Sequence, residues 1–118
     1  MPARLRPAAA AEVAAALAAE QRSGAQTRLL VKHFLAVLSE RAPGASVEVR
    51  VPPYAAVQAV PGVRHTRGTP PAVVELDAET WIALSTGTLT WASAETTGRV
   101  RASGERADLS GLLPLEAP

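Results

Sequence analysis

The sequence has no cysteine, only two histidines and almost no excess of charge of either sign. Without cysteine the chain can form no disulfide, thiolate nucleophile or cysteine-based zinc site. His33 and His65 lie far apart in different local patterns, so no metal cluster is expected. The 118 residues carry 12 Lys and Arg against 11 Asp and Glu, and this balance argues against nucleic-acid binding, which needs a basic face. These absences predict a fold that is stabilised by side-chain packing, without disulfides and with no metal or other cofactor.

Long apolar runs are missing as well. No stretch approaches the roughly 20 apolar residues that a membrane-spanning helix needs. The alanine-rich start carries early arginines, but Glu12 interrupts it and alanine is only weakly hydrophobic, so it does not resemble an export signal. We therefore expect a cytoplasmic protein with one modest core.

Apolar residues recur in the sequence with two different periods. The helical period occurs first along the chain. Residues 7–21 favour an alanine-rich helix that can bury little, because it has few larger apolar side chains. A stronger amphipathic helix is expected over residues 26–41, where apolar side chains recur at helical spacing. We therefore divide the chain into an N-terminal helical segment, residues 1–24, and a main domain, residues 25–118.

The second periodicity, of two residues, indicates strands. These are expected at residues 46–51, 54–60, 72–76 and 99–103. Between the last two, short helices are expected after Asp77 and Thr90, which are good N-caps. Asp108 is expected to cap a last helical turn through Leu113. The order predicts an α+β fold: a largely antiparallel sheet of four to five strands with helices packed on one face.

The stretch Pro70–Leu115, "PPAVVELDAETWIALSTGTLTWASAETTGRVRASGERADLSGLLPL", resembles the second half of the sterol carrier protein 2 family. The shared features are a strand, an acidic helix cap, two short helices that each end at glycine, a further strand ending at glycine, and a leucine-rich end. The chain is most similar to the small bacterial sterol-carrier-like proteins that begin with extra helices.

This resemblance implies a sheet of about five strands covered by helices, with an apolar tunnel between the layers. Val63–Thr66 would supply a fifth, very short strand. The tunnel would accept a fatty acyl chain, a sterol or another lipid. The partner implied is thus a lipid or similar apolar small molecule.

Six apolar side chains are candidates to contact such a ligand, because lipid sites are concave and mostly apolar. They are Leu30, Phe34, Val37, Trp81, Leu84 and Trp91. Ordinary core packing is the alternative for each of them, since a small domain loses stability when it is hollowed out.

The stretch "GVRHTRGTPP", residues 62–71, holds the densest group of basic and titratable side chains. Arg64, His65 and Arg67 are candidates for a basic rim that holds an anionic head group, because arginine offers a bidentate fork. The alternative is a solvated basic hairpin stiffened by prolines. The stretch lacks the spacing of a phosphate-binding P-loop and precedes a strand instead of a helix.

Catalysis has little support in the sequence. No serine lies in a nucleophile-elbow pattern, and Asp77 and Asp108 are better explained as helix caps. We therefore expect no enzyme but a sterol-carrier-like lipid-binding domain. The alternative is a non-catalytic interaction or accessory module, acting as a homodimer or docked on an enzyme partner.

Overall fold

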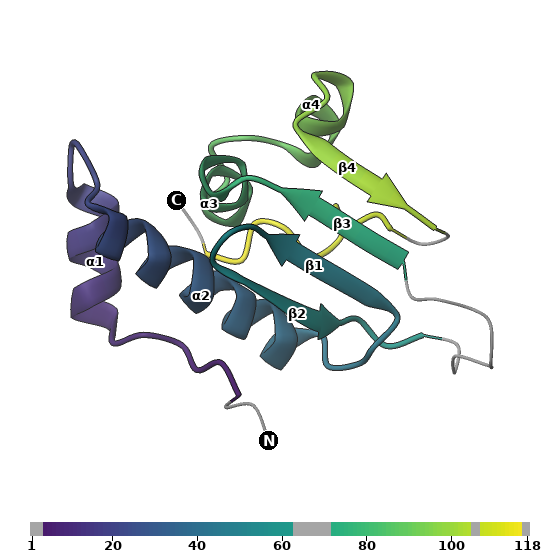
Figure 1. The fold of residues 1–118 in the computed structure, drawn as a ribbon, viewed down its shortest axis with the longest axis horizontal. Helices are drawn as coiled ribbons and strands as arrows, with labels where there is room; N and C mark the ends of the chain where they lie inside the picture. Colours follow the sequence, from purple (N-terminus) through teal and green to yellow (C-terminus); the bar gives the residue numbers. More distant parts are fainter. Residues whose placement is uncertain (1–3, 63–71, 105–106, 117–118) are drawn as a thin grey trace.

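The computed structural model describes residues 4–62, 72–104 and 107–116. Helices and strands alternate in small groups along the chain (Figure 1). The elements are α1 (Ala10–Ala18), α2 (Gly24–Arg41), β1 (Val47–Val51), β2 (Ala55–Ala59), β3 (Ala72–Leu76), α3 (Ala78–Thr86), α4 (Trp91–Thr96) and β4 (Val100–Ser103). The predicted α+β class is confirmed.

The four strands form one mixed sheet in the order β2-β1-β3-β4. β1 is antiparallel to β2 and parallel to β3, and β3 is antiparallel to β4. Most of the pairing is therefore antiparallel, as expected. The predicted fifth strand, Val63–Thr66, lies outside the described residues.

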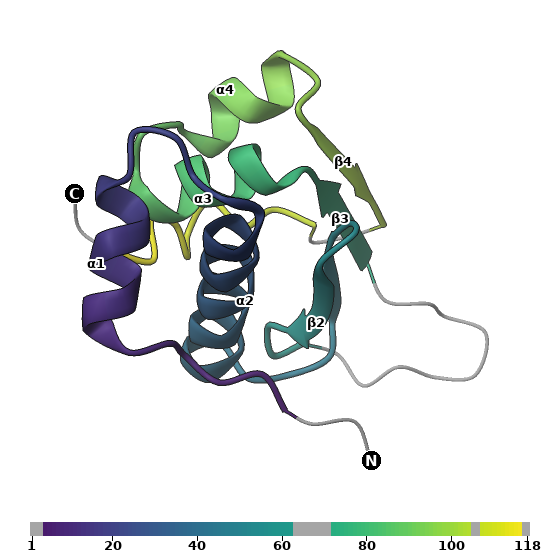
Figure 2. The ribbon, with the colours of Figure 1, turned by 60° about the vertical axis from the view of Figure 1, so that its left-hand side comes forward.

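One face of the sheet is buried and the other is open. Val47, Val49 and Val74 point to the buried face and are 0% exposed. On the open face, Arg50 of β1 lies opposite Glu75 of β3 in the parallel register. Its Nη2 forms an ion pair with the Glu48 carboxylate at 2.8 Å. Figure 2 shows α1, α2 and α3 together on one side of the sheet, with α1 outermost. The two-residue alternation in the sequence thus marks which side the helices cover.

α2 begins at Gly24, two residues earlier than expected, because a capping box precedes it. The Ser23 hydroxyl accepts a hydrogen bond from the Gln26 amide at 3.1 Å, and the Gln26 side chain accepts one from the Ser23 amide at 3.0 Å. Two amides that have no partner inside the helix are satisfied in this way.

α1 is shorter than the helix expected over residues 7–21. It nevertheless docks firmly on α2, since Val13 is 4% and Ala16 1% exposed. Both belong to the same apolar cluster as Leu30 and Leu35 of α2. The proposed division of the chain at residue 24 stays a prediction.

The last helical turn expected from Asp108 through Leu113 is present only as one hydrogen-bonded turn, in which the Leu112 amide donates to the Leu109 carbonyl at 2.9 Å. The segment forms turns, and Asp108 accepts a hydrogen bond from the Ser110 amide at 2.8 Å without starting a helix. Gly111 weakens helix formation, and Pro114 disfavours helical geometry at the residue before it. The chain is instead tied to α3, because the amides of Leu115 and Glu116 both donate to the Ser85 carbonyl, at 2.9 and 3.1 Å.

Candidate functional site: a cleft between α1, α2 and α3

A cleft of about 720 Å³ lies between α1, α2 and α3. We call it the α1–α3 cleft. Its apolar wall comes from the N-terminal segment, α1 and α3, and consists of Ala8, Ala10, Val13, Ala14, Leu17, Ile82 and Ala83. Alanines make up more than half of this wall, and their short side chains leave the space between the helices unfilled. Two of these alanines, Ala10 and Ala14, belong to α1, and the others come from the N-terminal segment and α3.

The polar lining of the cleft consists of Arg22, His33, Glu79, Thr86, Thr88 and Glu116. Arg22 follows α1 and bridges two elements. Its Nη1 lies 3.2 Å from the Glu79 carboxylate on α3, and its Nε donates to the Ala16 carbonyl at 3.1 Å. The pair is partly exposed, with the side chains of Arg22 and Glu79 exposed by 23% and 65%. Arg22 thus fixes the end of α1 to α3.

His33 of α2 ties the N-terminal segment down. Its Nδ1 accepts a hydrogen bond from the Ala8 amide at 2.9 Å, which requires the neutral imidazole with its proton on Nε2. Burial lowers the pKa of His33 below 6.5, while the charges of Glu116 and Glu40 act in the opposite direction. The neutral form, and with it the hydrogen bond to Ala8, is therefore favoured at neutral pH.

The six apolar side chains predicted to contact a ligand lie elsewhere. Leu30, Phe34, Trp81 and Leu84 are at most 1% exposed, and Trp91 is 5% exposed. Val37 is half-buried and packs against the same cluster. The structure brings these residues together as core, and none of them lines the α1–α3 cleft. Their role in ligand binding stays a prediction.

The predicted basic rim, Arg64, His65 and Arg67, lies outside the described residues. Sequence reasoning did not identify the cleft that the structure shows. One signal was present: Val13 and Leu17 are spaced by four residues in a helix whose other residues are alanines and Glu12, so they mark the face that turns inward. No local pattern joins Arg22 to Glu79, which lie 57 residues apart in the sequence.

The described parts of the chain offer neither a metal site nor a membrane-spanning helix. Within residues 4–62, 72–104 and 107–116, no group of three or more His, Asp or Glu side chains could hold a metal ion. In the same residues, no helix combines the length and the apolar character needed to cross a membrane.

A mixed sheet covered on one face by helices is the α+β arrangement that the resemblance implies. The α1–α3 cleft differs from the tunnel expected between helices and sheet, because no residue of the described strands is among its lining residues. Comparison with protein families supports the sterol-carrier-like class: residues 21–115 match the family described as bacterial SCP ortholog. The chain belongs to this family, and the suspected resemblance is confirmed. Comparison with curated proteins gives no match.

Proposed function

We propose that the chain is a carrier domain that holds a fatty acyl chain, a sterol or a similar apolar ligand in the α1–α3 cleft. The observation that carries this proposal is an apolar-walled cleft of about 720 Å³ in a chain of the SCP family. Small-molecule sites have volumes of roughly 300–1,000 Å³ and combine an apolar wall with a few polar groups. The cleft has both properties.

Burial of the ligand's chain would drive binding. Each methylene removed from water contributes about 0.8 kcal/mol. Val13, Leu17 and Ile82 offer the larger apolar contacts, and the alanines leave room for the chain between them. A polar end of the ligand would lie near Thr86, Thr88 or His33. When Nδ1 of His33 accepts from Ala8, its Nε2 carries a proton, which it donates to no other described residue.

We infer a carrier and not an enzyme. Three polar groups of the cleft are engaged within the fold: Arg22 contacts Glu79, and the neutral His33 accepts from the Ala8 amide through Nδ1. A general base needs a lone pair within reach of the proton that it removes, and the lone pair of this imidazole is already used. Cytoplasmic location and a homodimer stay predictions.

The proposal is tested by titrating the protein with an environment-sensitive fluorescent fatty acid. We expect saturable binding at micromolar concentrations and displacement by unlabelled lipid. Ala14→Phe should weaken binding about tenfold or more, which corresponds to 1.4 kcal/mol, because Ala14 lines the cleft and the ring would fill it. Ala15→Phe is the matched control, since Ala15 is exposed on the same helix and is not among the lining residues.

Two results would contradict the proposal. The first is absence of saturable binding at micromolar concentrations. The second is equal loss of binding in Ala14→Phe and Ala15→Phe. Equal loss would mean that a large side chain anywhere on α1 disturbs binding and that filling the cleft is not the cause. Absence of binding together with a concentration-dependent dimer in sedimentation would favour the interaction module.

A further inference from the structure

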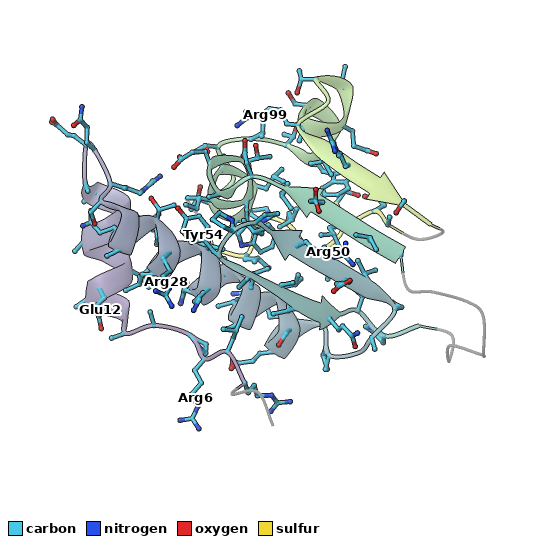
Figure 3. All side chains as sticks on the ribbon, in the orientation of Figure 1. Arg6, Glu12, Arg28, Arg50, Tyr54 and Arg99 are labelled. Atoms are coloured by element: carbon cyan, nitrogen blue, oxygen red, sulfur yellow. The ribbon has the colours of Figure 1, made fainter. Side chains whose placement is uncertain are left out.

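A second groove, of about 640 Å³, shares Ala8 and His33 with the α1–α3 cleft. It lies along α2 between the N-terminal segment and the turn that follows β1. Its chemistry is set by Arg6, Arg28, Lys32, Leu29 and Tyr54. We call it the basic groove. Figure 3 shows that three of its side chains come from different parts of the fold: Arg6 from the N-terminal segment, Arg28 from α2 and Tyr54 from the turn.

The basic groove is strongly charged, although the whole chain is nearly neutral. Arg6, Arg28 and Lys32 line it, and no carboxylate from the described part of the chain does. Among the described residues, none of these three cations has an ion pair or a side-chain hydrogen bond. The α1–α3 cleft has the opposite balance, with Glu79 and Glu116 against Arg22. Positive charge is therefore concentrated on one of the two hollows.

Holding these cations together has an energetic cost. Arg28 and Lys32 are four residues apart on α2, where like charges destabilise a helix by about 0.2–0.5 kcal/mol. Arg6 lines the same groove from the N-terminal segment, which the hydrogen bond from the Ala8 amide to His33 holds on α2. The Arg6 side chain is exposed and extends away from the helix (Figure 3). A bound anion would remove the repulsion.

The groove favours a phosphate over a carboxylate. A phosphate monoester carries roughly −1.5 to −2 charges at pH 7 and three acceptor oxygens, so it can engage several cations at once. Arginine binds phosphate through a planar fork and lysine as a point charge. Leu29 and Tyr54 are half-buried and offer apolar surface beside the cations. This combination suits an ester whose organic part is at least partly apolar.

We propose that the basic groove binds the phosphate group of a phosphate ester, with Arg6, Arg28 and Lys32 as its ligands. The ester is either a soluble phosphorylated compound or the head group of a phospholipid. The proposal does not depend on ligand binding in the α1–α3 cleft.

The test is a titration of the ¹⁵N-labelled protein with phenyl phosphate at low ionic strength, followed by NMR. Saturable shifts are expected at the amides of Arg28, Leu29 and Lys32, and benzyl alcohol, which lacks the phosphate, should give none. The double variant Arg28→Gln/Lys32→Gln should bind about tenfold more weakly or worse, as expected for the loss of charge-assisted hydrogen bonds. Arg41→Gln/Arg101→Gln is the matched control, because it removes the same charge from exposed positions outside the groove.

A second arm identifies the source of the phosphate. The protein is sedimented with vesicles of phosphatidylcholine alone or with phosphatidylglycerol added. Binding of phenyl phosphate without sedimentation supports a soluble ester, and sedimentation that the Arg28→Gln/Lys32→Gln variant loses supports a head group.

The proposal is overturned if neither probe binds, or if the control variant loses as much affinity as the groove variant. Thermal unfolding verifies that both variants fold, and the exposed single change Arg28→Gln repeats the test if the double variant does not. Because the shifts are read at α2 amides, failure here is distinct from failure of fatty-acid binding in Ala14→Phe.

Discussion

At the scale of single residues, the two tryptophans show that equal burial does not mean equal stabilisation. Trp81 is 0% exposed, and its indole N–H donates to the Val31 carbonyl of α2 at 3.3 Å. Trp91 is 5% exposed, and its buried indole N–H has no partner among the described residues. A buried donor without a partner costs roughly 1–3 kcal/mol.

This difference predicts unequal effects of the same substitution. Trp81→Phe loses both packing and a hydrogen bond and should lower the free energy of unfolding by about 2–3 kcal/mol. Trp91→Phe loses packing but also removes the unsatisfied donor, so we expect a loss of about 1 kcal/mol or less. Urea unfolding followed by circular dichroism measures both. A larger loss of unfolding free energy for Trp91→Phe than for Trp81→Phe would contradict the view that the indole N–H of Trp91 is unsatisfied.

His33 makes stability depend on pH. Its pKa is lowered below 6.5 by burial, against the opposing charges of Glu116 and Glu40. Between the lowered native pKa and 6.5 the unfolded chain binds the proton more readily, so stability rises with pH across this window and falls as pH decreases through it. Arg22 and Glu79 face the same cleft, and Arg28 and Lys32 line the neighbouring groove.

The measurement is an NMR titration of the His33 ring protons together with unfolding experiments at several pH values. We expect a pKa below 6.5 and faster exchange of the Ala8 amide once the ring is protonated. His33→Gln should remove this part of the pH dependence. Because this variant keeps only the second histidine, His65, it also shows which ring signals belong to His33. A pKa above 6.5 would show that His33 is not held in the neutral form.

The core residues were predictable from the sequence one by one, but the cleft was not. Leu30, Phe34, Trp81 and Leu84 follow clear helical periodicity, and they are buried. A cleft depends on what is absent between two helices, and its alanines carry no signal apart from their helix propensity. The space arises only when α1 is placed beside α3.

At the scale of elements, α1 is the wall that makes the cleft, and Arg22 holds it in place. The hydrogen bond from Arg22 to the Ala16 carbonyl joins the loop to α1, whereas the contact with Glu79 is a partly exposed ion pair. Exposed ion pairs contribute about 0–1 kcal/mol. Most of the anchoring therefore comes from the bond to the backbone and from Val13 and Ala16.

Substitutions at the two ends of this ion pair should therefore differ. Arg22→Ala should destabilise the protein by about 1–2 kcal/mol and speed amide exchange in α1. Glu79→Ala removes only the exposed ion pair, and we expect about 0.5 kcal/mol or less. Hydrogen exchange and thermal unfolding measure both. Equal effects would mean that Arg22 contributes to stability through the ion pair alone and that its hydrogen bond to Ala16 contributes nothing.

Element boundaries were predictable where a cap defines them. Asp77 accepts a hydrogen bond from the Thr80 amide at 2.8 Å, and α3 runs from Ala78 to Thr86 as expected. Asp108 carries the same local signal, yet its segment forms only turns, because Gly111 weakens helix formation and Pro114 disfavours helical geometry at the residue before it. A cap alone cannot distinguish the two outcomes.

At the scale of the whole molecule, the fold places two hollows on either side of one hydrogen bond, that between Ala8 and His33. The α1–α3 cleft is apolar-walled, and the basic groove is positively charged. Fold class and family were predictable from the second half of the sequence, where strand, caps and glycines recur in the order of sterol-carrier-like proteins. The positions of the hollows depend on contacts of the N-terminal segment, which has no comparable pattern.

The central claim is that an apolar ligand lies in the α1–α3 cleft. Intermolecular NOEs between a ¹³C-labelled fatty acid and the methyl groups of the protein test it most directly. The account predicts contacts from the acyl chain to Val13, Leu17 and Ile82, which line the cleft. Contacts to Leu30 and Leu84 in the core instead, or no intermolecular contacts at saturating ligand, would contradict it.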